Sequence, residues 1–184
     1  MTDEERFRAL FADTRRQVER YARHRGVSGA DLEDLIAATY EVAWRRFDRV
    51  PAGDESIAWL LAVARNHLRN HRRRIIRDRD LLTRLPAPAR SDPSGVGGGA
   101  DWQDVRRALG ALRAGDRELL LLISWDELTP AQTAVVLGIS SGAARARLHR
   151  ARRRLAAEVD RLSAEPSASG RTSAPPKACK ASTP

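Results

Sequence analysis

The sequence has very little cysteine or lysine. Its single cysteine, Cys179, stands near the end of the 184 residues, so neither a disulfide framework nor a cysteine-based zinc site is available. Lys177 and Lys180 are the only lysines, and arginine therefore supplies nearly all of the 33 basic side chains. No run approaches the roughly 18 apolar residues of a membrane span, and the N-terminus lacks the pattern of a signal peptide. We expect a cytoplasmic protein without membrane insertion.

The excess of positive charge is confined to one part of the chain. The formal net charge is +9, yet residues 1–64 carry 10 basic and 12 acidic side chains. Arginine binds phosphate oxygens and guanine edges with two parallel hydrogen bonds and stacks on bases. The composition thus favours a nucleic-acid partner and excludes the front of the chain as a general polyanion binder.

The apolar residues follow a helical period. No segment alternates apolar and polar residues with a period of two, so nothing predicts a sheet. Apolar side chains recur every three or four positions over residues 5–25, 28–47 and from 57 onward, with a loop at 48–56. Ser28 and Asp31 have the spacing of a capping box for the second of these helices. We predict an all-α fold.

Composition divides the chain into two small helical domains. Residues 86–100 are rich in proline, glycine and serine, which is typical of a flexible linker. We predict a first domain at 1–82, a linker at 83–100 and a second domain at 101–162 with about four short helices. Residues 163–184 are too poor in apolar side chains to fold and are predicted to be a disordered tail.

The second domain contains a strong helix-start signal. Thr129, Pro130 and Gln132 combine a threonine N-cap, a proline at the first helical position and a glutamine that completes a capping box. Gly138 is suited to end that helix, and Ser140 can cap the next one only two residues later. Two helices that meet at so tight a corner form a helix-turn-helix, which we predict at residues 129–155.

The outward face of the second helix of this motif is expected to be basic. Residues 145–154 contain six arginines and no acid, whereas a face that is merely solvated usually mixes both signs. That plainer interpretation stays open, but a basic helix of this kind fits the major groove of DNA. The candidate DNA-binding residues are Arg145, Ala146, His149, Arg150 and Arg153.

A second basic cluster lies on the third predicted helix. His67 and His71 stand one turn apart, a spacing that could bind a metal, but no third ligand is evident, so we expect neither a metal nor a cofactor. Trp44 and Trp59 could stack on unpaired bases, although aromatics on amphipathic helices more often fill cores, and we expect Trp44 in the core. The cluster consists of Arg65, Arg69, Arg72, Arg73, Arg74 and Arg77, interleaved with Asn66, His67, Asn70 and His71.

Enzyme signatures are weak. The glycines at 97–99 lack the lysine and hydroxyl of a phosphate-binding loop. Asp31, Glu33 and Asp34 have no histidine or metal partner in sequence. We expect no catalytic residues.

Taken together, the motifs resemble those of an extracytoplasmic-function sigma factor, over roughly residues 5–160. The resemblance rests on Asp31-Leu32-Glu33-Asp34-Leu35-Ile36 through Ala43-Trp44, on Ala58-Trp59-Leu60 through Ala64-Arg65-Asn66, and on Leu137-Gly138-Ile139-Ser140 through Arg147-Leu148-His149-Arg150-Ala151-Arg152.

The resemblance implies a promoter-specificity subunit of bacterial RNA polymerase that assists promoter melting and has no catalytic residues. The second domain would read the upstream promoter element, and the first would hold a flipped base of the start-proximal element. An anti-sigma factor is a further implied partner. The implied start-proximal residues are Arg65, Asn66, Arg69 and Arg73. The implied contacts to core RNA polymerase are Asp34, Leu35, Thr39, Trp44 and Arg45.

Two departures from the family pattern concern, in turn, docking on the polymerase clamp and promoter specificity. Ala37 and Ala38 replace the usual glutamine and acid, and Gly142-Ala143-Ala144-Arg145 replaces the usual Gly-Thr-Val-Lys. We expect a changed promoter sequence but retained DNA binding. The alternatives are a conventional helix-turn-helix regulator that binds duplex DNA without core polymerase, and a basic nucleic-acid enzyme.

Overall fold

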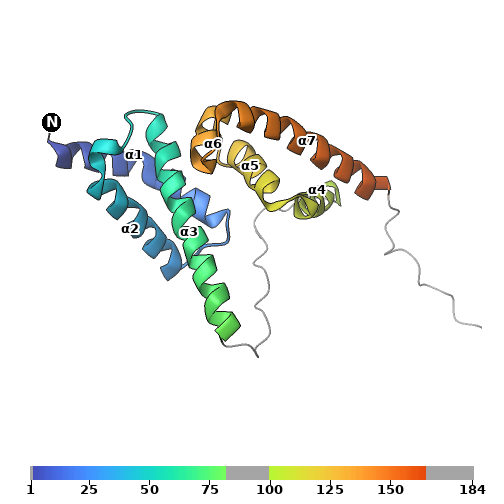
Figure 1. Ribbon diagram of the computed structural model, residues 1–184, viewed down its shortest axis with the longest axis horizontal. Coiled ribbons are helices and arrows are strands. Elements are labelled where there is room, and N and C mark those ends of the chain that lie inside the picture. Colours follow the sequence, from blue (N-terminus) through green and yellow to red (C-terminus); the bar gives the residue numbers. More distant parts are fainter. Residues whose placement is uncertain (1, 82–99, 165–184) are drawn as a thin grey trace, which may run out of the picture.

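The computed structural model describes residues 2–81 and 100–164, and every regular element in these two ranges is helical. The helices form two groups (Figure 1), which confirms the predicted all-α fold. The first group contains α1 (Asp3–Arg23), α2 (Ala30–Arg45), the short 3-10 helix η1 (Phe47–Arg49) and α3 (Glu55–Leu81). The second contains α4 (Ala100–Ala111), α5 (Ala114–Ser124), α6 (Pro130–Leu137) and α7 (Ser141–Ala164).

The predicted linker and tail fall largely outside this description. Residues 83–99 of the linker and 165–184 of the tail are not among the described residues, so the proposed domain boundaries stay predictions. Among the described helices, none has the length and apolar character that crossing a membrane requires.

The start of α2 differs from the prediction. Its N-cap is Gly29, with φ 60° and ψ −141°, and no side chain caps the helix. This backbone conformation is strained for residues with a Cβ, and glycine adopts it readily. Because the chain turns at Gly29, Ser28 lies outside the helix, and the predicted capping box between Ser28 and Asp31 is wrong.

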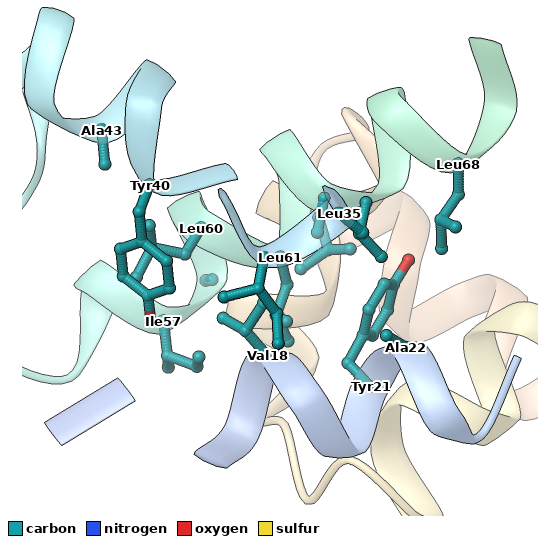
Figure 2. Close-up of a cluster of buried hydrophobic side chains, with 14 of the residues drawn as sticks. Val18, Tyr21, Ala22, Leu35, Tyr40, Ala43, Ile57, Leu60, Leu61 and Leu68 are labelled. Carbon is teal, nitrogen blue, oxygen red and sulfur yellow. The ribbon is translucent and has the colours of Figure 1, made fainter. Parts of the chain in front are cut away.

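The first core fills the space between α1, α2 and α3 (Figure 2). Tyr21 is completely buried, and Tyr40 shares a 2.8 Å hydrogen bond with Thr14 across α1 and α2. The apolar residues that the figure labels are Val18, Tyr21, Ala22, Leu35, Tyr40, Ala43, Ile57, Leu60, Leu61 and Leu68.

The second group has its own smaller core and also contacts the first. Leu119 and Leu148 are buried where α5 meets α7. Leu122, Leu128 and Val136, however, belong to the same buried cluster as the core of α1–α3. The two groups therefore share an apolar boundary, at which α6 packs on α3.

Candidate nucleic-acid interface

The corner between α6 and α7 is built from the residues that the sequence singled out. The Thr129 Oγ1 accepts a 3.2 Å hydrogen bond from the Gln132 N–H, and the Gln132 Oε1 accepts a 2.9 Å bond from the Thr129 N–H. Gly138 ends α6 with a left-handed φ of 68°, which glycine tolerates without strain. The Ser140 Oγ accepts a 3.2 Å bond from the Ala143 N–H, so that α7 begins at once. The predicted helix-turn-helix is confirmed.

The outward face of α7 is basic and accessible. No described residue forms an ion pair with Arg145, Arg150 or Arg153. The opposite side of the helix is anchored by the buried Ala144, Leu148 and Ala151. Apolar packing thus fixes which side of α7 faces outward. The structure places all five predicted residues on the surface: Arg145, Ala146, His149, Arg150 and Arg153.

Two other arginines of α7 turn back toward α5. The Asp116 carboxylate accepts a 3.0 Å bond from the Arg147 Nε and a 2.5 Å bond from the Arg154 Nη1. Burial of Asp116 raises the pKa of its carboxyl, but these hydrogen bonds lower it, and the net effect holds the pKa below its ordinary value. Sequence reasoning missed these pairs, because Asp116 lies outside the run of arginines.

The guanidinium of Arg65, a predicted DNA contact, is already hydrogen-bonded within the protein. Its Nε and Nη2 donate to the two carboxylate oxygens of Glu118 on α5, at 2.7 and 2.8 Å. This paired geometry raises the pKa of the Arg65 guanidinium. Burial raises the pKa of Glu118, but the bonds from Arg65 outweigh it and leave that pKa below its usual range. Arg65 therefore joins the two helical groups here.

Beyond Arg65, the arginines of α3 whose side chains the structure describes are exposed. Asn66, Arg69 and Arg73 are exposed, so three of the four predicted start-proximal residues lie on the surface. The side chains of Arg72, Arg74 and Arg77 are outside the described residues. No cluster of three or more His, Cys, Asp or Glu side chains in the described part of the chain could hold a metal ion.

The predicted polymerase-binding residues of α2 divide into surface and core. Asp34, Trp44 and Arg45 are exposed, whereas Leu35 and Thr39 are buried. The Thr39 Oγ1 donates to the Leu35 carbonyl at 2.7 Å, which satisfies the hydroxyl inside the helix. Leu35 and Thr39 cannot contact a partner from these positions, and this part of the prediction is corrected.

Trp44 also departs from its predicted place in the core, because half of its surface (50%) is exposed. Its ring makes an edge contact with Phe7 of α1, at 5.0 Å between centroids, and lies 6.4 Å from the ring of Phe47. The guanidinium of Arg6 lies 5.1 Å from the Phe47 ring. Phe7, Trp44 and Phe47 form an aromatic cluster at the surface, which the helical period alone did not separate from core positions.

A polar contact between the helical groups was likewise not foreseen. The buried Asp126, in the turn after α5, lies 3.2 Å from the His24 Nδ1 and accepts a 3.1 Å bond from the Arg25 Nη1. The Gln132 Nε2 donates to the Asp54 carbonyl at 2.9 Å, which links α6 to the loop before α3. These partners are 78 to 102 residues apart in sequence, so no local pattern indicates them.

Comparison with known families matches both helical groups. Residues 10–78 match Sigma-70 region 2, which covers most of α1–α3. Residues 102–155 match Sigma-70 region 4, a range that contains most of α4, all of α5 and α6, and the basic part of α7. The two regions follow the predicted order.

Individual relatives agree with this match. The sigma factor NccH of Alcaligenes xylosoxydans xylosoxydans is 27% identical over 77% of this chain and 80% of its own length. The ECF RNA polymerase sigma factor SigL of Mycobacterium tuberculosis is 30% identical over 84% of this chain and 89% of its own.

A solved structure shows the same arrangement. The sigma factor RpoE of Bartonella quintana, determined in complex with the anti-sigma factor NepR, superposes with a TM-score of 0.59 and 26% identity. The superposition covers 85% of this chain and 98% of that one. These matches favour a transcription initiation factor over a conventional helix-turn-helix regulator, and the chain belongs to the extracytoplasmic-function family of RNA polymerase sigma factors.

Proposed function

We propose that this sigma factor divides promoter recognition between two helices, α7 for the upstream element and α3 for the start-proximal element. The observation that carries the proposal is the outward face of α7, where Arg145, Arg150 and Arg153 are exposed without an ion-pair partner among the described residues. Accessible arginines on a helix that projects from a helix-turn-helix are suited to the major groove of DNA.

Different residues on α7 would supply affinity and selectivity. Contacts of arginine to phosphates provide most of the affinity, and they depend steeply on salt. One or two bidentate contacts of arginine to guanine contribute about 1–3 kcal/mol of discrimination each. The small side chain of Ala146 lets the helix approach the bases between longer neighbours.

On α3, Asn66 and the exposed Arg69 and Arg73 would hold the separated strand. Flipping a base costs a few kcal/mol, which contacts to the base edge and the backbone offset. Arg65 can join them only after its contact with Glu118 opens.

The surface of α2 would dock on core RNA polymerase. Asp34, Trp44 and Arg45 are its accessible candidates, since Leu35 and Thr39 are buried. A half-exposed tryptophan is typical of the central residues of protein interfaces.

The relatives suggest the cellular setting. RpoE of Bartonella quintana was solved with the anti-sigma factor NepR, and we expect that an anti-sigma factor also binds this chain. This sigma factor would act by binding its partners and would not catalyse a chemical reaction. This binding would take place in the cytoplasm, where promoter DNA and core polymerase meet.

The first experiment asks whether the purified full chain co-elutes with core RNA polymerase of its host and directs initiation at specific promoters. Failure with that core enzyme would contradict the proposal.

The second experiment separates the two helices. Arg150→Ala should reduce selectivity for the upstream element, whereas Asn66→Ala should spare duplex binding and impair open-complex formation. Arg8→Ala, which removes a surface arginine paired with Glu4 on α1, is the control and should change neither. Equal losses of duplex affinity at every sequence in both test variants would show that α7 and α3 do not have separate roles in promoter recognition.

A further inference from the structure

Asp116 holds two arginines of the DNA-reading helix. Arg147 and Arg154 are seven residues apart, about two helical turns, so they leave α7 on the same side. Each donates to a different oxygen of Asp116, at 3.0 and 2.5 Å. Asp116 with Arg147 and Arg154 is called the Asp116 cluster below.

The Asp116 cluster is not an ordinary surface ion pair. The Asp116 side chain is only 6% exposed, whereas those of Arg147 and Arg154 are 36% and 48% exposed. A buried carboxylate is costly unless hydrogen bonds compensate it. Loss of the arginines would therefore leave the buried Asp116 carboxylate without compensation. Loss of the aspartate would cost the arginines little, because their guanidinium groups stay in contact with water.

Gly115 provides an independent sign of the same arrangement. A Cβ at position 115 would collide with the guanidinium of Arg147, whose atoms are its three nearest neighbours. The guanidinium thus lies directly against the backbone of α5. Positions 115 and 116 together bind the guanidinium of Arg147. Gly115 leaves room for it because it has no side chain, and Asp116 supplies the negative charge that pairs with it.

The position of these arginines on α7 determines what they would do if released. They lie between the buried side, with Leu148 and Ala151, and the outward face, with Arg150 and Arg153. The sides of a helix that enters the major groove are close to the phosphates of the groove walls. Released side chains would therefore reach phosphates, which carry no sequence information.

We propose that Asp116 is a specificity-determining residue, which withholds Arg147 and Arg154 from the DNA backbone and so keeps sequence-independent binding weak. The proposal rests on the proposed reading of DNA by the outward face of α7. Contacts to phosphates tighten binding to every sequence alike, whereas base contacts distinguish sequences. Removal of the aspartate should thus raise affinity and lower selectivity at the same time.

The test measures binding of the full chain to a random-sequence DNA duplex over a range of salt concentrations. Each added phosphate contact steepens the plot of log affinity against log salt by about 0.9. Asp116→Asn, which removes the charge, and Gly115→Ala, which displaces Arg147, should both bind the random duplex at least about threefold more tightly and with a steeper slope. The expected steepening is about 0.9 for Gly115→Ala and up to about 1.8 for Asp116→Asn.

Glu158→Gln is the matched control for net charge. Glu158 also lies on α7 and also pairs with an arginine, Arg161, at 2.6 Å, but within the C-terminal end of the same helix. Its substitution should leave the slope unchanged. Circular dichroism checks that every variant is folded.

The double substitution Arg147→Ala with Arg154→Ala tests the proposal from the side of the arginines. It leaves the buried Asp116 carboxylate without these hydrogen bonds, so its slope is read only if circular dichroism shows that the variant is folded. In the otherwise unchanged chain it should not alter the slope, because these arginines do not touch DNA while the Asp116 cluster is formed. Added to Asp116→Asn, it should return the slope to that of the unchanged chain. A double variant whose slope falls by about 1.8 would show that both arginines already bind phosphates, and would overturn the proposal.

A second comparison separates this proposal from the proposed function. The same variants are assayed against a duplex that the unchanged chain enriches from a random pool, and Asp116→Asn should lower the ratio of enriched to random affinity at least about threefold. If the unchanged chain enriches no sequence, the DNA-reading role of α7 fails. If it does enrich one, but folded Asp116→Asn and Gly115→Ala keep both slope and ratio, only the role of Asp116 fails.

Discussion

Arg65 and Glu118 face each other across the boundary between the two helical groups and share two parallel hydrogen bonds, of 2.7 and 2.8 Å. Arg65 belongs to α3 and Glu118 to α5, so the pair links region 2 to region 4. A carboxylate and a phosphate present the same kind of oxygen acceptors to arginine. While the pair is formed, Glu118 occupies the donors that Arg65 would use on a promoter strand.

Glu118→Gln should make Arg65 available to DNA. A hydrogen bond to a charged group contributes about 1.5–3 kcal/mol, so loss of one such bond should tighten binding of single-stranded promoter DNA by about tenfold, and by no more than about 150-fold. Fluorescence anisotropy with a labelled single strand measures the change. Glu41→Gln is the control, because Glu41 is exposed and pairs with Arg45 inside α2. Unchanged binding by a folded Glu118→Gln variant would show that the pair does not compete with DNA.

A low pH should weaken the ion pairs that Asp116 and Glu118 form with arginines. The pKa values of Asp116 and Glu118 lie below their ordinary values in the folded chain, because burial, which raises them, is outweighed by hydrogen bonds from arginine. A carboxyl with a lowered folded-state pKa stabilises the fold above its ordinary pKa of about 4 and loses that contribution as the pH falls through the lowered value. Urea unfolding between neutral pH and about pH 3 should show this decline, and Glu118→Gln should make it shallower. If the stability of Glu118→Gln declined identically with falling pH, the decline would be due to other carboxylates.

The two tyrosines of the first core should respond in opposite ways to loss of their hydroxyls. The Tyr21 hydroxyl is buried without a hydrogen-bond partner among the described residues, whereas the Tyr40 hydroxyl bonds to Thr14 at 2.8 Å. Tyr21→Phe should leave the free energy of unfolding unchanged or raise it, and Tyr40→Phe should lower it by about 1 kcal/mol. Denaturant unfolding of both variants checks this, and a loss at Tyr21 as large as that at Tyr40 would reveal a partner for its hydroxyl.

The ionisation of Tyr21 offers a second measurement. Burial raises the pKa of Tyr21 to about 12. Because the raised value favours the neutral form, its contribution to stability is complete below the ordinary pKa of about 10 and is lost as the pH rises toward 12. Absorbance of tyrosinate should therefore develop well above pH 10 and coincide with unfolding. Tyr21→Phe should shift this alkaline unfolding to higher pH.

Local signals in the sequence were sufficient for the helix-turn-helix. The cap at Thr129 and the helix end at Gly138 depend on residues within one turn, and both occur as predicted. The start of α2 was mispredicted because two adjacent positions, Ser28 and Gly29, can both begin a helix, and only the backbone conformation of Gly29 decides between them.

Contacts between distant residues could not be predicted in this way. Glu118 is 53 residues from Arg65, and Asp116 is 31 residues from Arg147. The arginine run on α7 contains no acid in sequence, yet the buried Asp116 of α5 pairs with two of its arginines. Sequence spacing determines which side of a helix a residue occupies, but the partner on that side depends on how the helices pack.

Two glycines should separate backbone strain from helix propensity. Gly138 has a left-handed φ of 68°, whereas Gly110 lies inside α4, and a Cβ at either position would meet open space. Gly138→Ala should destabilise the fold by about 1–2 kcal/mol, because residues with a Cβ avoid this conformation. Gly110→Ala should stabilise it, by less than the about 1 kcal/mol of a helix interior, because Gly110 is the second-to-last residue of α4. Thermal unfolding measures both, and a stabilising Gly138→Ala would mean that α6 ends elsewhere.

Trp44 tests whether the aromatic surface of α1 and α2 docks on polymerase. Because the side chain is 50% exposed, Trp44→Ala should cost less stability than the about 3–5 kcal/mol of a buried tryptophan. Loss of an aromatic residue at the centre of an interface typically weakens binding by about 2 kcal/mol or more.

The matched control is Val135→Ala, since Val135 is 53% exposed but lies on α6, away from the proposed docking surface. Binding of each folded variant to core RNA polymerase is measured by titration with labelled sigma factor. Trp44→Ala should weaken it at least about thirtyfold, and Val135→Ala should leave it unchanged. Equal affinities would show that Trp44 does not anchor the contact with polymerase.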